Sequence, residues 1–268
     1  MPLRYRVTRH IFATFALGAV VLAATAHARQ GTALPEEGRW NDRMAGIFAG
    51  RVQLEGGYTF LTDRSADTRI RQHVVPDLLL RYGLTERLEL RLGWPGFVST
   101  EYDGPSAPPP FDDTLKPNVG FMWDALNQDG WVPQTALLAA VPITLEGNPF
   151  TMNSLQPLSQ VLYCWYVSDR TSLGGTTGVA LFHEFGDHFV QLQQTADIDY
   201  LWSDRLSTFV QWEVLVDHGS DDDGTQHLLG TGLSFLWTER LQTTWRLGVG
   251  LNERAPNLLT GIRFALRF

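Results

Sequence analysis

Charged side chains at alternate positions are the residues of this sequence that are best suited to a chemical role. Guanidinium and carboxylate groups on opposite sides of a water-filled passage would create a transverse field that orients dipolar solutes. Eight arginines stand on the polar side of alternating segments, namely Arg51, Arg69, Arg71, Arg81, Arg91, Arg246, Arg263 and Arg267. Three carboxylates stand at equivalent positions in other segments, namely Asp197, Asp199 and Glu213. These side chains are the candidate functional residues if the fold brings them into one interior.

Other reactive residue types occur at His183, Glu184, Asp187 and His188. The spacing His-Glu-x-x-x-His is one residue longer than the helical zinc-protease motif, and these residues lie in alternating segments typical of strands. No serine has the surroundings of a nucleophile. The sequence therefore assigns no catalytic residue, no metal ligand and no cofactor, although an enzyme that acts on membrane lipid stays open as an alternative.

The composition excludes several classes of protein. The 268-residue chain has a formal net charge of -8, which argues against nucleic-acid binding through bulk charge. Its mean hydropathy of -0.12 argues against a bundle of membrane helices, since each helix needs about 20 apolar residues in a row. The single cysteine, Cys164, excludes an intramolecular disulfide. An aromatic content of 12% with 9 tryptophans favours a β-protein at a membrane interface.

The N-terminal residues have the three parts of a secretory signal peptide. A start that contains three arginines precedes an apolar stretch, which ends in the small-residue pattern Ala26-His27-Ala28. This order predicts export with cleavage after Ala28, and an uncleaved membrane anchor is the alternative. The chain is thereby divided into a signal peptide at 1–28, a periplasmic N-terminal lead-in at 29–48 and a folded domain at 49–268.

From residue 49 onward, apolar and polar residues alternate with a period of two, which is typical of β-strands with one apolar face. In one example, Leu88, Leu90 and Leu92 alternate with Glu89 and Arg91. Twelve strands are predicted, at 49–60, 69–84, 88–99, 116–126, 131–143, 155–167, 171–185, 189–202, 206–216, 226–237, 241–252 and 257–268.

Short turns join these segments at one end, and longer loops join them at the other. The short turns share the order Ser or Thr, then Asp or Glu, then Arg, in which the side chains can bond to the backbone of the turn. Aromatic residues precede these turns, as an interfacial girdle requires. The pattern occurs at Thr85–Arg87, Ser168–Arg170, Ser203–Arg205 and Thr238–Arg240.

An even number of alternating strands with this asymmetry of turns predicts a transmembrane antiparallel up-and-down β-barrel of about 12 strands. We expect it in the outer membrane of a Gram-negative-type bacterium, surrounded by outer-membrane lipid. Closure would pair the first strand with the last and join the arginines into one basic wall that faces the carboxylates. A soluble β-sandwich is the alternative fold, and a lumen plugged by its own side chains is the alternative interior.

The end of the chain has an apolar face made of Phe264, Leu266 and Phe268. This face resembles the C-terminal signal that the barrel-assembly machinery of the outer membrane recognises. The machinery is therefore an expected partner.

Three stretches resemble a family of outer-membrane transporters named for the MetA-pathway (meta-pathway) of phenol degradation. They are Leu79–Gly93, Ser159–Gly175 and Thr238–Phe268, the last of which contains Gly-Val-Gly-Leu-Asn at 248–252. Where that family tends to have Asp-Arg-Pro before its first strand, this chain has Asp-Arg-Met at 42–44. The resemblance implies passive diffusion of small solutes, including aromatic compounds, without a cofactor or energy source. A non-conducting structural barrel is a further alternative.

Overall fold

The computed structural model describes residues 49–268 except 66, 106, 144–156, 185–186 and 220–222. Every element in this part of the chain is a β-strand. Its residues form no helix long and apolar enough to cross a bilayer. The predicted signal peptide and lead-in, residues 1–28 and 29–48, lie outside the described residues.

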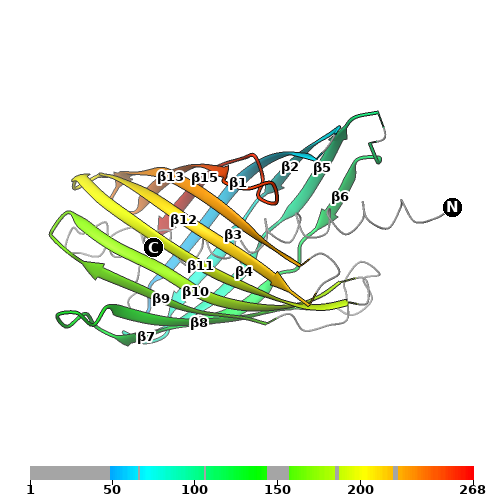
Figure 1. Ribbon diagram of the computed structural model, residues 1–268. Coiled ribbons are helices and arrows are strands. Elements are labelled where there is room, and N and C mark those ends of the chain that lie inside the picture. The colour runs from blue at the N-terminus through cyan, green and yellow to red at the C-terminus, as the bar shows by residue number, and fades with distance from the viewer. Residues whose placement is uncertain (1–48, 66, 106, 144–156, 185–186, 220–222) are drawn as a thin grey trace.

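Twelve strands of the described chain close into a ring (Figure 1). The first strand pairs with the last, from Gln53 opposite Arg267 to Thr62 opposite Leu258. The predicted closed antiparallel barrel is therefore confirmed. In order around the ring, the strands are β1 (Val52–Ser65), β3 (Leu78–Gly83), β4 (Leu88–Trp94), β7 (Asn118–Leu126), β8 (Gln134–Pro142), β9 (Leu158–Tyr166), β10 (Thr171–Glu184), β11 (Asp187–Ser203), β12 (Leu206–His218), β13 (Gly224–Thr238), β14 (Leu241–Gly250) and β15 (Leu258–Arg267).

Three further strands extend part of this ring at the end where the longer loops lie, which we call the loop end (Figure 1). They are β2 (Thr68–Val75), β5 (Phe97–Asp103) and β6 (Phe111–Thr114). Each continues a ring strand across a proline, at Pro76, Pro95 and Pro117. Proline has no N–H to donate to the ladder, so it interrupts strand pairing at these positions.

The break at Pro76 adds one residue to its strand. The Asp77 N–H donates to the carbonyl of Gly57 at 2.9 Å, whereas Val74 already pairs with Thr59. Three steps along β2 and β3 therefore match two steps along β1, as in a β-bulge. An extra residue reverses which side chains face inward. The buried residues are accordingly Asp77, Leu79 and Arg81 on one side of the break and Ile70, Gln72 and Val74 on the other.

The hydroxyl groups of the short turns bond to the backbone as predicted. Thr85 Oγ1 accepts hydrogen bonds from the backbone N–H groups of Arg87 at 3.2 Å and Leu88 at 3.0 Å. Equivalent bonds form at Ser168, Ser203 and Thr238. These turns lie together at one end of the ring, which we call the turn end.

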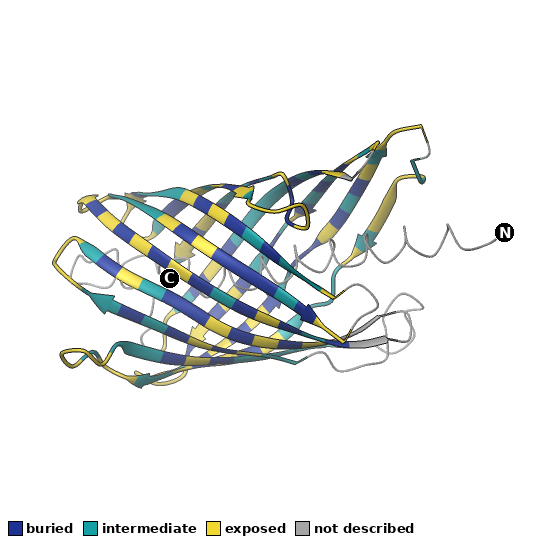
Figure 2. Cartoon of the chain, viewed as in Figure 1, coloured by how far each residue is buried: buried dark blue, intermediate teal, exposed yellow. Residues whose placement is uncertain are grey.

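The outer face of the ring is apolar and its inner face is largely polar. Figure 2 shows exposed and buried residues alternating along the strands. Glutamine, threonine, carboxylate and arginine side chains make up most of the buried polar set. This arrangement is the reverse of a soluble protein and matches a barrel that spans a bilayer. Exposed apolar residues include Leu54, Leu80, Leu92, Val119, Phe121, Leu192, Ile198, Val210, Leu247 and Phe264.

Candidate functional site

Five of the predicted arginines project into the barrel interior. They come from β3, β4, β14 and β15, which lie side by side around β1. The exposed fractions of Arg81, Arg91 and Arg263 are 1%, 6% and 6%, and Arg246 and Arg267 are half-buried. Arg51 directly precedes β1 at the turn end and is exposed.

Arg69 and Arg71 do not line the interior. Both lie on β2, where Arg69 pairs with Arg64 and Arg71 pairs with Thr62 on the outward side of β1. The prediction continued one alternation through Pro76, but the extra residue there reverses the two faces. The predicted interior position of these two arginines is therefore wrong, and they lie on the outer surface at the loop end.

Arg81 is the centre of a buried ion-pair network that joins β1, β3 and β4. Its Nε and Nη2 donate to the two carboxylate oxygens of Glu89 at 2.7 and 2.8 Å. Its Nη1 donates to Glu55 Oε1 at 3.3 Å, and Arg91 Nε donates to Glu89 Oε1 at 2.7 Å. A bidentate guanidinium–carboxylate pair is both strong and geometrically specific. The network therefore holds three neighbouring strands in register.

Arg263 connects this network to the last strand. Its Nη2 bonds to Asp77 Oδ2, and its Nη1 lies 3.7 Å from Glu55 Oε2. Nearer the turn end, Arg267 Nη2 donates to Gln53 Oε1 at 3.1 Å, and Gln53 Nε2 donates to Glu55 Oε1 at 2.9 Å. Charged groups thus cross the seam where the first and last strands meet.

The predicted carboxylates also point inward, from β11 and β12. Asp197, Asp199 and Glu213 are 6%, 2% and 1% exposed. Glu213 does not face an arginine across the lumen, because Arg246 Nη2 donates to its Oε2 at 3.2 Å. The basic and acidic residues therefore meet along the wall at this point, which corrects the expectation of two separate facing walls.

A chain of amide hydrogen bonds extends this contact around the wall. Gln193 Nε2 donates to Glu213 Oε1 at 2.7 Å. Gln160 Nε2 in turn donates to Gln193 Oε1 at 2.8 Å. Polar side chains consequently bond from β9 through β11 and β12 to β14.

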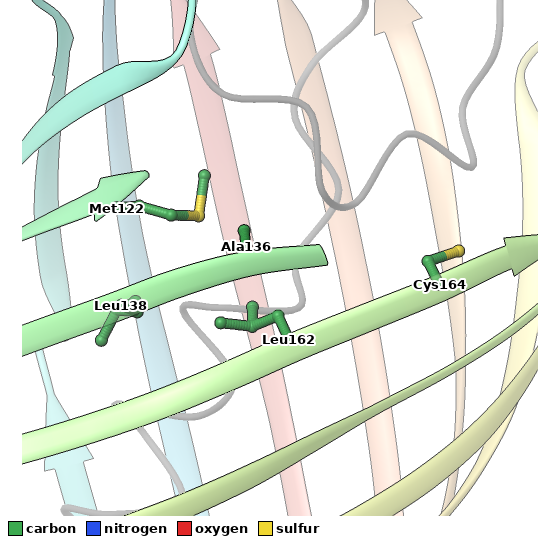
Figure 3. Packing of buried hydrophobic residues seen from close by; sticks show 5 residues of the cluster. All are labelled: Met122, Ala136, Leu138, Leu162 and Cys164. Atoms are coloured by element: carbon green, nitrogen blue, oxygen red, sulfur yellow. The ribbon is translucent and has the colours of Figure 1, made fainter. Parts of the chain in front are cut away.

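An apolar arc that the alternation of the sequence does not reveal lies on the inner face of β7, β8 and β9 (Figure 3). The exposed fraction of each of its residues is 5% or less. The arc adjoins the charged residues, since Arg91 Nη2 lies 3.1 Å from Met122 Sδ. Residues on both faces of β8 are apolar, so alternation does not reveal which of them face inward. The arc consists of Met122, Ala136, Leu138, Leu162 and Cys164.

The side chains of His183, Glu184, Asp187 and His188 lie outside the described residues. Within the residues that are described, no group of three His, Cys, Asp or Glu could hold a metal ion.

The C-terminal residues Phe264, Leu266 and Phe268 are on the outer surface, with exposed fractions of 49%, 36% and 57%. Their recognition by the assembly machinery stays a prediction.

A closed antiparallel ring with an apolar exterior and a charged, hydrogen-bonded interior defines the class as a transmembrane β-barrel of the outer-membrane type. The translocator domain of the autotransporter NalP from Neisseria meningitidis has this fold, with a TM-score of 0.60, 12% identity, and coverage of 97% of this chain and 98% of that chain. The β domain of the Bordetella autotransporter BrkA matches with a TM-score of 0.52 and 7% identity, and the match covers 82% of this chain and 100% of that chain. A NanC porin matches with a TM-score of 0.50 and 10% identity, and the match covers 80% of this chain and 98% of that chain. At these identities the likeness shows the fold alone.

The sequence of the second half of the barrel indicates a particular family. Residues 160–268 match the family described as "Putative MetA-pathway of phenol degradation". The match runs from β9 to the end of β15 and confirms the resemblance that the sequence motifs indicated. No curated protein matches the chain.

Proposed function

We propose that the chain is an outer-membrane channel through which small solutes diffuse passively. The observation that carries the proposal is the inward orientation of arginines, carboxylates and glutamines in a ring whose outer face is apolar. Rings of charged side chains are a means by which pores select solutes. A twelve-stranded ring is wider than the eight-stranded barrels that side chains fill. The proposal includes no cofactor, no energy source and no catalytic step.

We infer that aromatic compounds are among the solutes. The apolar arc lies on the inner wall of the barrel, and the guanidinium group of Arg91 lies at its edge, with Nη2 3.1 Å from Met122 Sδ. A guanidinium group attracts the face of an aromatic ring. The match to a family named for phenol degradation supports the same class of solute.

Ion selectivity tests whether the inward arginines line a conducting path. Arg267 is suited to the test because it is half-buried on the inner side of β15 near the turn end, where its Nη2 donates to the neutral side chain of Gln53. In planar bilayers under a KCl gradient, we expect Arg267→Glu to shift the reversal potential toward cation preference, since it replaces a positive charge by a negative one.

Arg64→Glu is the matched control. It makes the same change of charge at an exposed position on the outer face of β1, and we expect it to leave the reversal potential unchanged. No shift with Arg267→Glu would mean that this side chain does not line the path, and an absence of current steps from the unmodified protein would refute the channel itself.

A further inference from the structure

Two arginines stand directly opposite each other on the outer surface at the loop end. Arg64 of β1 and Arg69 of β2 are register partners, and both are exposed. Like charges at directly opposite positions destabilise an antiparallel pair. Neither guanidinium group forms an ion pair with another described residue. The structure by itself therefore gives no compensation for their repulsion.

Two carboxylates on the neighbouring strand β5 are already engaged by a third arginine. Arg71 Nη2 lies 2.6 Å from Asp103 Oδ2 and 3.5 Å from Glu101 Oε2. Asp103 is the register partner of Arg69 on the other side of β2, but its Oδ2 accepts a hydrogen bond from Arg71. Arg64 and Arg69 thus form the end of a cationic patch, which we define as Arg64, Arg69 and Arg71.

The position of this patch along the barrel axis corresponds to lipid headgroups. On the outer face below it, Tyr58 OH lies 2.7 Å from His73 Nδ1, and the rings of Phe60 and His73 are 5.0 Å apart. Tyrosine and tryptophan are the aromatic residues enriched where such a protein meets the lipid headgroups. Twelve residues separate Val52 from Arg64, which at about 3.3 Å per residue and a tilt of about 40° is a height of roughly 30 Å. The apolar band of such barrels is about 25 Å tall.

We propose that Arg64 and Arg69, with Arg71 beside them, bind the phosphate groups of lipopolysaccharide in the outer leaflet. A phosphate between two guanidinium groups accepts charge-assisted hydrogen bonds from both and replaces their repulsion by a bridge. This site rests on the proposed location in the outer membrane. It is independent of conduction through the lumen, because the patch lies on the opposite face of the wall.

Binding of purified lipopolysaccharide to the refolded mature chain in uncharged detergent micelles tests the proposal. An arginine near an anionic lipid surface contributes about a fivefold factor in affinity. We therefore expect Arg64→Gln with Arg69→Gln to weaken binding about thirtyfold. The matched control, Arg205→Gln with Arg240→Gln, changes two arginines at the turn end and is expected to alter affinity by less than about twofold.

Two further measurements test which part of the lipid is bound and whether the two arginines repel each other. Lipopolysaccharide without its phosphates should bind the unmodified protein as weakly as the double variant binds the intact lipid, and inorganic phosphate alone should not reproduce the binding. Without lipid, the double variant should be at least as stable as the unmodified protein, because it lacks the repulsion.

Equal affinity of the double variant and the unmodified protein, or equal affinity for the phosphorylated and dephosphorylated lipid, would overturn the proposal. Heat-dependent gel mobility shows whether each variant has folded. If the double variant does not fold, the single variants decide, each with an expected loss of about fivefold. A barrel that binds phosphorylated lipid but carries no current would retain this site and refute only the channel.

Discussion

Arg81→Met is expected to lower the free energy of unfolding by about 3–5 kcal/mol, the cost of removing one partner from a buried ion pair. The side chains of Glu55, Glu89 and Arg81 are each 1% exposed. Methionine has a similar length but no charge, so Glu89 keeps only Arg91 as a guanidinium partner and Glu55 keeps only the more distant Arg263. The measurement is urea unfolding of the refolded protein in lipid vesicles, followed by tryptophan fluorescence.

Two comparisons separate the charge effect from lost packing. Arg87→Met makes the same substitution at an exposed turn position, where we expect a change of less than about 0.5 kcal/mol. Adding Glu55→Gln to Arg81→Met should recover part of the loss, because the nearest remaining guanidinium group is 3.7 Å away and a neutral amide costs less to bury than a poorly paired carboxylate. If Arg81→Met is no more harmful than Arg87→Met, the network does not hold the strands together.

Leu92→Arg is expected to destabilise the barrel by about 2–4 kcal/mol, the cost of an arginine on the lipid face near the middle of the bilayer. Leu92 is 48% exposed on the outer face of β4, and its neighbours Arg91 and Gly93 point inward. The charge would have to enter hydrocarbon or distort the bilayer to reach water. The same unfolding measurement in vesicles reports the loss.

Leu84→Arg is the control for this substitution. Leu84 is 43% exposed and lies at the turn end, where the expected cost falls to about 0–1 kcal/mol because the side chain reaches the headgroups. Equal tolerance of arginine at both positions would show that the outer face of β4 is not in contact with hydrocarbon.

The strands and turns could be predicted because both depend on local sequence. Alternation with a period of two defines a strand without knowledge of its partner. It places β11 at 189–202, where the structure has Asp187–Ser203. The turns at Thr85 and Thr238 are held by hydroxyl groups that bond within three residues, so the residue types suffice to identify them.

The reversal of faces at Pro76 could not be predicted from alternation, because a bulge is defined by two strands together. Its extra residue is visible only when Asp77 and Val74 are matched to Gly57 and Thr59 of β1. A local signal did exist, since prolines interrupt three successive segments at similar positions. Reading those prolines as bulges would have placed Arg69 and Arg71 on the outer face.

The contact between Arg246 and Glu213 shows a second limit of sequence patterns. Alternation indicates that both side chains face inward, but β12 and β14 are separated by β13. Neighbouring strands are about 4.8 Å apart, so two long side chains can meet across an intervening strand. Whether the two side chains are close enough to meet depends on the stagger of the strands around the ring, which cannot be derived from the sequence of one strand.

Solute-dependent swelling of liposomes tests most directly whether the barrel is a channel. Liposomes that contain the refolded mature protein are diluted into isotonic solutions of uncharged solutes of increasing size, and the rate of swelling is recorded by light scattering. A channel predicts swelling faster than that of protein-free liposomes, with rates that decrease as solute size increases. Swelling equal to that of protein-free liposomes for even the smallest solute would contradict it.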